Sequence, residues 1–306
     1  MPARGRAQGS ALSYLREGTV MLQRMDGKTV IVTGANAGIG KATAAALADL
    51  GAHVIMACRS PERGQRALEE LSAVPGRKLS LMRVDLADLA SVRAFADEFQ
   101  RRYDTLDALV NNAGMLGRRH TLTKDGFEQQ FQTNYLGHFL LTMRLLPLLE
   151  RAPQGRVVML GSIAHWWTHV HFDDINMMHG YNRMLGYGRS KLCNLLFCRY
   201  LAARCKAAGS RVTVNTAHPG IVASDIIVDR RNDMFRFIAT LSRAVLISSE
   251  KGAKTSVYLA AGDGLAAVSG EYFVRCKIAR SSPRSHNMAD AKRLFQMSEG
   301  FCRDYL

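Results

Sequence analysis

Short runs of β-branched and apolar residues alternate along this chain with segments whose apolar residues recur every three or four positions. The runs have the character of strands buried on both faces, and they lie at 29–32, 53–57, 79–84, 106–110, 156–160, 212–216 and 271–274. The periodic segments predict helices, which include 41–50, 88–99, 127–149, 187–207 and 249–261. This alternation is typical of the α/β class and predicts a doubly wound, Rossmann-type parallel sheet of about seven strands with helices on both faces.

The length of the chain fits one large domain. Its 306 residues, 47% of them hydrophobic, are enough to bury a full core. We expect the domain at 25–276, preceded by a flexible basic arm at 1–24 and followed by a C-terminal extension at 277–306. Within the domain, 221–248 is apolar with interspersed charges and lacks strong helix caps, which predicts a lid over the site.

The composition gives no sign of a membrane span or a metal site. No apolar run reaches the roughly 18 residues that cross a bilayer, and the N-terminus lacks the apolar core of a signal peptide. Six cysteines are scattered without a Cys-x-x-Cys pair, so neither a zinc site nor a redox dithiol is expected. We expect a soluble cytoplasmic protein. The arginine-rich start also resembles an organelle transit peptide, and Met21 and Met25 are alternative initiators.

The net charge of +15 bears on which anionic partners the chain can bind. The arginines are dispersed over many segments and do not alternate with aromatic residues on one predicted face, so nucleic-acid binding is not expected. A basic surface of this kind favours a small anionic ligand, such as a phosphorylated dinucleotide.

A glycine-rich turn joins the first strand to the first helix. Its glycines allow a tight turn and a close approach of a pyrophosphate to bare backbone, while the helix N-terminus offers free N–H groups to anionic oxygens. The strand before the turn, the helix after it and the strand at 53–57 are the surroundings that a dinucleotide site requires. The turn residues that we assign to the cofactor site are Gly34, Asn36, Gly38, Ile39 and Gly40.

The second strand ends in Ala-Cys-Arg-Ser, with Arg59 where a dinucleotide fold reads the ribose. A carboxylate at this place accepts hydrogen bonds from a free 2′-hydroxyl, whereas an arginine accommodates a 2′-phosphate. The sequence therefore favours NADP(H) over NAD(H). The alternative is that Arg59 only extends from a strand end into solvent.

The later strands also end in polar or small residues, and ligands collect at the carboxyl ends of parallel strands. The residues that we assign to the site at these ends are Asp85, Leu86, Asn112, Ala113, Gly114, Ser162, Pro219 and Gly220. The position of Asp85 favours contact with an adenine ring. Its alternative is a structural role in a turn.

Tyr187 and Lys191 lie four residues apart in a predicted helix and therefore share one face. At about 5 Å and an effective dielectric constant near 20, an ammonium attracts a tyrosinate by roughly 3 kcal/mol, which is about two pKa units. The lysine would thus make the phenol a usable general acid or base near neutral pH. Alone, such a pair is common on ordinary helix surfaces, so its meaning depends on the other motifs.

Taken together, the motifs resemble those of the short-chain dehydrogenase/reductase family over residues 27–275. The resemblance rests on Thr33-Gly34-x-x-x-Gly38-x-Gly40, Asn111-Asn112-Ala113-Gly114, Asn134, Ser162, Tyr187-x-x-x-Lys191 and Pro219-Gly220. It implies a catalytic tetrad in which Tyr187 exchanges a proton with the substrate oxygen, while Ser162 donates a hydrogen bond to that oxygen. It further implies that Lys191 holds the ribose of the cofactor, and that Asn134 holds a water molecule of a proton relay.

Within that family the chain is most similar to the retinol dehydrogenase branch, which includes NADP-dependent retinal reductases. The signs are Ala57-Cys58-Arg59, Asn134-Tyr-Leu-Gly-His-Phe139, Phe172-Asp-Asp-Ile-Asn176, Tyr181-Asn182 and Ser190-Lys-Leu-Cys-Asn194. This resemblance implies an NADP(H)-dependent oxidoreductase that interconverts a hydrophobic alcohol and its aldehyde or ketone.

Other functions are compatible with parts of the pattern. A dinucleotide-binding sensor or scaffold needs the cofactor residues but no ionisable phenol beside a lysine, so the complete tetrad argues against it. A nucleotide-sugar epimerase shares the Tyr-x-x-x-Lys chemistry, but the glycine spacing and the chain length fit it less well. A reductase of an unrelated, non-retinoid carbonyl stays open.

The helices expected at 127–149 and 187–207 are apolar beyond what one sheet face can cover. In the resembling family these helices form subunit contacts. We therefore expect a homodimer or a homotetramer.

Overall fold

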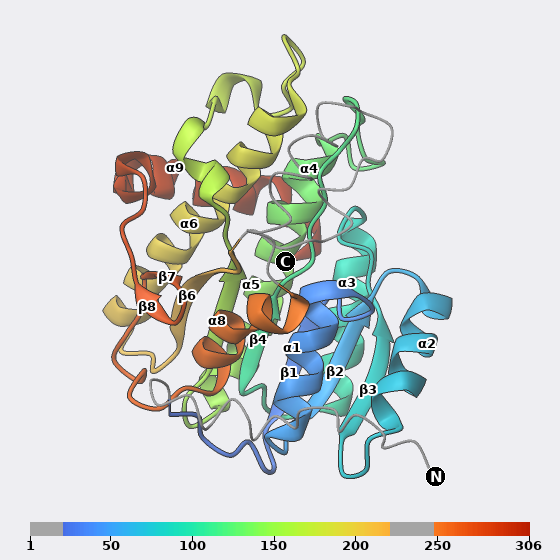
Figure 1. Cartoon of the computed structure of the whole chain (residues 1–306). Helices are drawn as coiled ribbons and strands as arrows, with labels where there is room; N and C mark the ends of the chain where they lie inside the picture. The colour runs from blue at the N-terminus through green and yellow to red at the C-terminus, as the bar shows by residue number, and fades with distance from the viewer. Residues whose placement is uncertain (1–20, 221–247) are drawn as a thin grey trace.

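Figure 1 shows the computed structural model of the chain, which describes residues 21–220 and 248–306. Within these ranges one sheet has the strand order β3-β2-β1-β4-β5-β6-β7-β8, and only its last pair is antiparallel. The strands are β1 (Thr29–Thr33), β2 (His53–Cys58), β3 (Lys78–Arg83), β4 (Ala108–Asn111), β5 (Arg156–Leu160), β6 (Thr213–His218), β7 (Tyr272–Val274) and β8 (Lys277–Ile278). The predicted doubly wound parallel sheet is confirmed, with the short strand β8 added at one edge.

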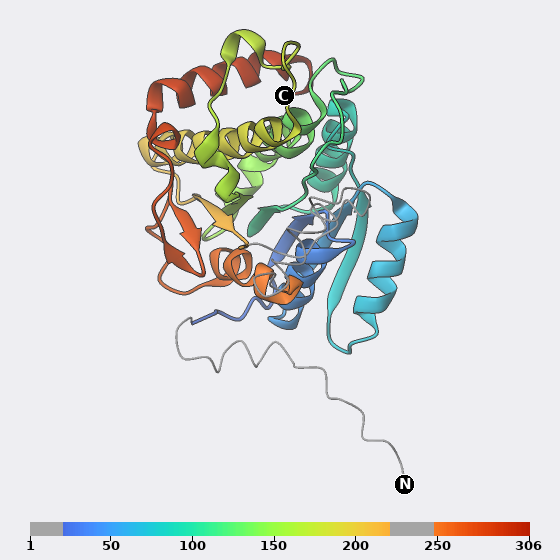
Figure 2. The ribbon, with the colours of Figure 1, turned by 45° about the horizontal axis from the view of Figure 1, so that its top comes forward.

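Helices cover both faces of this sheet, as Figure 2 shows. One face carries the alanine-rich half of the core, and the helices on it are α1 (Gly38–Asp49), α2 (Pro61–Ser72) and α8 (Ser249–Ala261). The other face carries the aromatic half, and the helices on it are α3 (Leu89–Arg102), α5 (Gly137–Arg151) and α6 (Arg183–Ala207), while α9 (Met288–Phe301) packs on α6. The strand order reverses between β1 and β4, and α/β sheets bind ligands at such a reversal.

The helix expected at 127–149 is one helical stretch with a change of winding near its start. It consists of α4 (Gln129–Phe131), the π-helical turn η2 (Gln132–Leu136) and α5. Asn134 lies in η2 and is fully buried. A π-helical turn displaces the backbone hydrogen-bond pattern by one residue and is frequent at functional sites, so Asn134 marks a place that deviates from an ordinary helix.

The C-terminal extension is folded, a feature that the sequence analysis did not predict. After the short turn η5 (Pro283–His286), α9 buries Ala291, Leu294 and Phe295 and is followed by η6 (Arg303–Tyr305). The ring of Phe295 lies 5.2 Å from that of Phe139 in α5 and 6.1 Å from that of Phe197 in α6. Thus α9 covers apolar surface of the two helices that we expected to contact another subunit.

The start of the predicted domain lies among the described residues, whereas most of its predicted lid does not. Residues 21–25 lie beside the C-terminal end of α8. There Gln23 N–H donates to the Ala261 carbonyl at 2.8 Å, and Asp263 N–H donates to the Met21 carbonyl at 3.0 Å. The predicted lid at 221–248 lies outside the described residues except for Ser248, which caps α8. None of the helices in the described ranges is long and apolar enough to span a bilayer.

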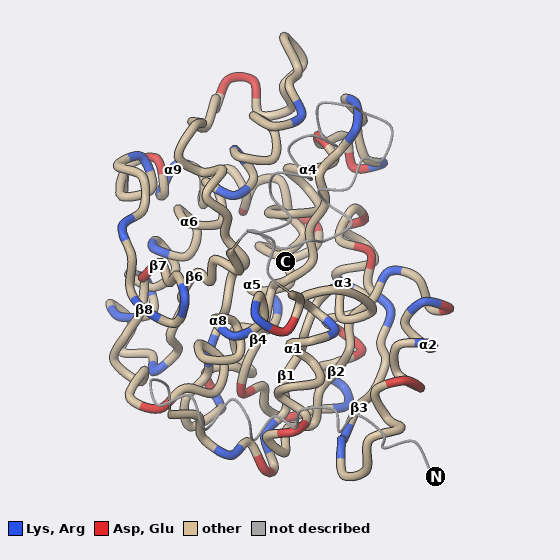
Figure 3. Tube along the Cα trace, viewed as in Figure 1, with Lys and Arg blue, Asp and Glu red and all other residues tan. Residues whose placement is uncertain are grey.

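Figure 3 shows that Lys and Arg are spread over many elements of the described chain, with Asp and Glu among them. This distribution agrees with a solvated basic surface and does not single out one element for a polyanion.

Candidate active site

The glycine-rich turn lies at the point where β1 and β4 end side by side. Gly34 and Gly38 have φ values of 67° and 54°, which favour glycine. A Cβ atom on Gly40 would overlap the carbonyl oxygen of Gly34 and the side-chain nitrogen of Asn112. The start of α1 can therefore approach these strand ends only with bare backbone. Of the other predicted turn residues, Ile39 packs on the core beneath α1 and Asn36 is half-buried.

Thr33, the last residue of β1, joins this turn to the turn after β4. Its Oγ1 accepts hydrogen bonds from the N–H groups of Asn112 and Ala113, both at 2.9 Å. The side-chain nitrogen of Asn112 donates in turn to the Thr33 carbonyl oxygen at 2.8 Å. The Asn112 Oδ1 atom is buried without a hydrogen-bond partner in the described part of the chain. An unpaired acceptor at this edge fits a hydrogen-bond donor of a bound dinucleotide, such as a ribose hydroxyl, and the bare glycine backbone leaves room for its pyrophosphate.

The other predicted cofactor residues lie at neighbouring strand ends. Arg59 is exposed after β2, and Pro219 and Gly220 follow β6, where Gly220 N–H donates to Nδ1 of His218 at 3.1 Å. After β3, Asp85 Oδ1 accepts from the N–H of Ala87 at 3.0 Å. The turn role that was the alternative for Asp85 is therefore present in the structure.

The side chain of Asn134 fixes the loop after β4 to α6. Its Oδ1 accepts from Met115 N–H at 2.8 Å, and its Nδ2 donates to the Met115 carbonyl at 3.0 Å and to Ser190 Oγ at 2.9 Å. Gly114 completes this contact, because a Cβ atom on it would lie 3.4 Å from Asn134 Oδ1 and 3.5 Å from Lys191 Nζ. The sequence-distant residues 114, 134 and 191 thus converge on one small volume.

Ser162, Tyr187 and Lys191 meet where β5 ends beside α6. Lys191 is buried, its Nζ lies 5.6 Å from the centroid of the Tyr187 ring, and it donates to the Leu160 carbonyl oxygen at 2.9 Å. The hydroxyl of Ser162 lies near enough to the Tyr187 phenol to lower the pKa of that phenol. The structure therefore brings the predicted phenol, ammonium and hydroxyl together.

The protonation of this group differs from the expectation based on Lys191 alone. Burial raises the pKa of the Tyr187 phenol above its ordinary value, although the nearby hydroxyl of Ser162 lowers it. Burial also lowers the pKa of Lys191 to about 8. The expected lowering of the tyrosine pKa by about two units considered only the attraction between the two charges. It left out the desolvation that accompanies a buried pair.

The family model of the short chain dehydrogenases matches residues 28–234 of this chain. The chain belongs to the short-chain dehydrogenase family. Mouse retinol dehydrogenase 14 is 41% identical over 291 residues, an alignment that covers 90% of this chain and 86% of the relative. The family membership makes the chain an oxidoreductase of the retinol dehydrogenase type that binds a nicotinamide dinucleotide.

Solved structures agree with this assignment. An uncharacterized protein from Mycobacterium paratuberculosis is similar with a TM-score of 0.75 and 33% identity, over 92% of this chain and 96% of that chain. The RhlG/NADP active-site complex from Pseudomonas aeruginosa is similar with a TM-score of 0.65 and 26% identity, over 81% and 94% of the two chains.

Two buried histidines of this dehydrogenase were missed as members of the site. His138 lies between Thr33 and the Asn134 carbonyl, and His165 contacts the Ser162 carbonyl. His165 follows Ser162 by three residues and His138 follows Asn134 by four, so each is one helical turn from a predicted catalytic residue. That proximity is the signal in the sequence that was available for both.

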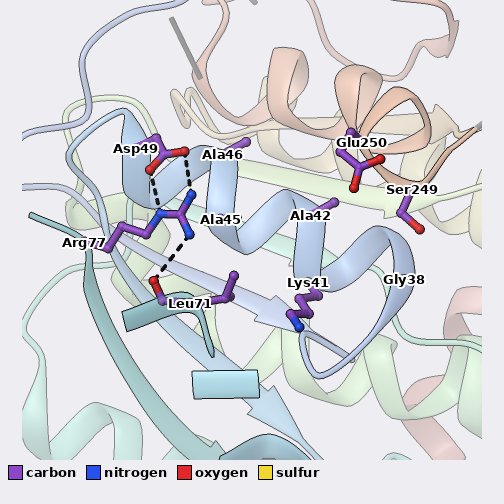
Figure 4. Close-up of a pocket in the computed structure, with 10 residues that line it drawn as sticks. All are labelled: Gly38, Lys41, Ala42, Ala45, Ala46, Asp49, Leu71, Arg77, Ser249 and Glu250. Atoms are coloured by element: carbon purple, nitrogen blue, oxygen red, sulfur yellow. Dashed lines mark hydrogen bonds and ion pairs between the residues drawn. The ribbon is translucent and has the colours of Figure 1, made fainter. Parts of the chain in front are cut away.

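A separate cavity of about 360 Å³ lies on the outer side of α1 and shares only Gly38 with the predicted site. Three alanines of α1 form its wall. Arg77 lies at one end of the cavity, where its guanidinium donates to the Asp49 carboxylate at 2.6 and 2.9 Å (Figure 4). Arg77 also donates to the Leu71 carbonyl at 3.3 Å. These contacts connect α1 to the end of α2, so the polar residues at this end of the cavity have a structural role.

Proposed function

We propose that this dehydrogenase is an NADP(H)-dependent oxidoreductase that interconverts a hydrophobic alcohol and its aldehyde or ketone. The observation that carries the proposal is the convergence of Ser162, Tyr187 and Lys191 at the carboxyl edge of the sheet. A bound nicotinamide dinucleotide supplies or accepts the hydride. The residues of the chain orient the substrate oxygen and move its proton.

The protonation states of Tyr187 and Lys191 favour reduction near neutral pH. Because burial raises the pKa of Tyr187, the phenol is protonated and can donate to a carbonyl oxygen. Ser162 supplies a second hydroxyl to the same oxygen, which stabilises developing negative charge. Lys191 is cationic below its pKa of about 8, and its position beside Gly114 places it against the turn that would hold a ribose.

The choice of NADP(H) rests on Arg59. It stands exposed at the end of β2, with no carboxylate at this strand end to accept from a free 2′-hydroxyl. An exposed guanidinium there pairs with a 2′-phosphate through charge-assisted hydrogen bonds.

The surroundings of Ser162 and Tyr187 favour a hydrophobic substrate. Large apolar side chains remain exposed in η3 (Ile163–Trp167) and at the start of α6, two elements that pack on each other next to both residues. They are Ile163, Trp166, Trp167, Met184 and Leu185. Exposed apolar surface next to a reactive group fits an apolar substrate better than a sugar or a charged one. The similarity to retinol dehydrogenase 14 makes all-trans-retinal the first compound to test.

The test is the oxidation of NADPH with all-trans-retinal and a panel of short and long aldehydes and ketones. Tyr187→Phe should abolish turnover and keep NADPH binding, since it removes only the proton donor. Tyr181→Phe is the matched control, because its hydroxyl accepts from Gln130 at 2.9 Å and lies in a different contact. Turnover of retinal well above the panel supports a retinoid substrate, and turnover of other carbonyls supports the non-retinoid reductase.

The same experiment addresses the second candidate, a sensor or scaffold that binds NADP(H) without chemistry. NADPH binding without oxidation, for any carbonyl tested, would favour it. Activity in Tyr187→Phe close to that of the natural chain would contradict the proposed mechanism.

The homodimer or homotetramer also remains a proposal. Since α9 covers apolar surface of α5 and α6 within one chain, an assembly has to use surface that α9 leaves open or other elements.

A further inference from the structure

We infer that His165 is a positioning residue for Ser162, and that the backbone N–H of Ser282 in the C-terminal extension fixes the ring of His165. The inference rests on the proposed function, because it concerns how the hydroxyl of Ser162 is aimed at a substrate oxygen.

The contacts of His165 leave its ring no freedom. Nδ1 lies 2.6 Å from the carbonyl oxygen of Ser162, and Nε2 lies 3.0 Å from the backbone nitrogen of Ser282. The ring is fully buried and meets the Tyr272 ring edge-on at 5.1 Å. Residues 162 and 282 come from the end of β5 and from the segment before η5, so one imidazole joins two distant parts of the chain.

These partners determine the tautomer. A carbonyl oxygen only accepts, so Nδ1 carries the proton, and a backbone N–H only donates, so Nε2 is the acceptor. A cationic ring would place a second N–H against the N–H of Ser282. Burial and the charge of Arg199 lower the pKa of His165, which agrees with a neutral ring.

The segment that supplies the N–H group is itself held firmly. Ser285 Oγ donates to the Ser282 carbonyl at 2.6 Å and lies 2.8 Å from Ser281 Oγ, and Arg199 in α6 donates to the same Ser281 hydroxyl at 3.0 Å. The serines at 281, 282 and 285 are all buried. The anchor of His165 is thus a rigid part of the fold that also contacts α6, the helix of Tyr187.

The consequence for the site follows from the backbone of Ser162. This residue is the N-cap of η3, with φ −157° and ψ 155°, and its carbonyl oxygen also accepts a long hydrogen bond of 3.4 Å from the N–H of His165. The ring of His165 therefore holds the peptide that sets the direction of the Ser162 side chain. Misplacement of a reacting group by about 1 Å can lower a rate by about 100-fold.

Ser282 offers a matched pair of substitutions. Its φ of −60° and ψ of 147° are values that proline adopts, and Pro283 already restricts this residue. Ser282→Pro therefore fits these backbone angles and removes the N–H donor, and its Cδ atom takes the place of that N–H against Nε2 of His165, so the ring has to leave its position. Ser282→Ala keeps the N–H and removes a hydroxyl that has no hydrogen-bond partner among the described residues.

The experiment compares kcat for carbonyl reduction and Kd for NADPH in both variants, in His165→Asn and in the double variant. We expect Ser282→Pro to lower kcat by about 10- to 100-fold with Kd within about twofold, and Ser282→Ala to match the natural chain. His165→Asn should lower kcat similarly, and adding Ser282→Pro to it should cost little more, because both changes break the same link. Equal kcat in the two Ser282 variants, or additive losses in the double variant, would overturn the inference.

A second measurement does not depend on turnover or on the folding of a variant. The ¹⁵N chemical shifts of the His165 ring in the natural chain should report the Nδ1–H tautomer near neutral pH. The Nε2–H tautomer or a cationic ring would overturn the inference even if no carbonyl substrate is found, whereas the failure of the proposed function alone would leave this signal in place.

Discussion

Nε2 of His138 lies 2.9 Å from Thr33 Oγ1, and Nδ1 of the same ring lies 3.1 Å from the carbonyl oxygen of Asn134. The imidazole thus connects the end of β1, which contacts both turns of the predicted cofactor site, to the π-helical turn that carries Asn134. Because the carbonyl oxygen only accepts, Nδ1 carries the proton, and Nε2 accepts from the Thr33 hydroxyl. The neutral ring is therefore part of the native hydrogen-bond network.

This arrangement predicts a loss of stability in acid. Burial lowers the pKa of His138 to about 3, whereas an unfolded histidine has a pKa near 6.5. Below about pH 6.5 the unfolded state binds the proton first, so the free energy of unfolding falls by about 1.4 kcal/mol per pH unit from this group until about pH 3. In His138→Gln this component should be absent, which urea unfolding between neutral pH and about pH 4 would measure.

The control for that series is His179→Gln, because 94% of the His179 side chain is exposed. Its stability should follow the same pH dependence as the natural chain. A slope in His138→Gln equal to that of the control would show that the buried ring does not couple folding to protonation.

Arg59 gives a prediction about cofactor choice. Replacement by Asp removes the proposed partner of a 2′-phosphate and adds a carboxylate that can accept from a free 2′-hydroxyl. We expect the Kd for NADPH to rise by about 10-fold or more relative to that for NADH, as for the loss of a charged hydrogen bond. Arg66→Asp makes the same charge change at an exposed position of α2 and should leave the ratio unchanged. Fluorescence titrations with NADPH and NADH would measure both Kd values. An unaltered ratio in Arg59→Asp would contradict the proposed role of Arg59.

A substitution of Gly40 should disturb the packing at the same edge of the sheet. The added methyl group of Gly40→Ala overlaps the Gly34 carbonyl oxygen and the Asn112 side chain, so α1 has to shift. We expect a loss of about 1–3 kcal/mol in unfolding free energy together with weaker dinucleotide binding. Gly300→Ala, in α9, meets no atom within 4 Å and should be neutral or stabilising. Equal urea midpoints for the two variants would contradict the close approach inferred here.

The sequence was sufficient for the parts of the fold that rest on local pattern. Buried strands appear as apolar runs, and the expected runs at 29–32 and 156–160 agree with β1 and β5 to within one residue. The convergence of Ser162, Tyr187 and Lys191 could be anticipated because strand ends and helix faces place them on one edge. The π-helical turn around Asn134 has no periodicity of its own in the sequence. The link from His165 to Ser282 spans 117 residues and depends on how the extension folds back.

The C-terminal extension shows why a helix was missed where its signals were present. Asn287 caps α9 by accepting from the N–H groups of Ala289 and Asp290, and apolar residues recur at 291, 294 and 295. The sequence analysis assigned no element to this basic segment, and no strand follows that would have demanded a helix. The apolar excess of α5 and α6, which we attributed to a second subunit, was the indirect sign that something in the chain had to cover them.

A substitution of Phe295 therefore tests whether α9 contributes to the stability of the folded domain. Its ring is 1% exposed and packs on Phe139, Phe197 and Tyr200, so Phe295→Ala should lower the free energy of unfolding by about 3–5 kcal/mol. Met288→Ala, at an exposed position of the same helix, should change it by less than about 0.5 kcal/mol. Because a loosened α9 uncovers apolar surface on α5 and α6, Phe295→Ala should also self-associate at lower concentration, which light scattering would detect. If both variants unfold at the same urea concentration and scatter alike, α9 does not stabilise the domain.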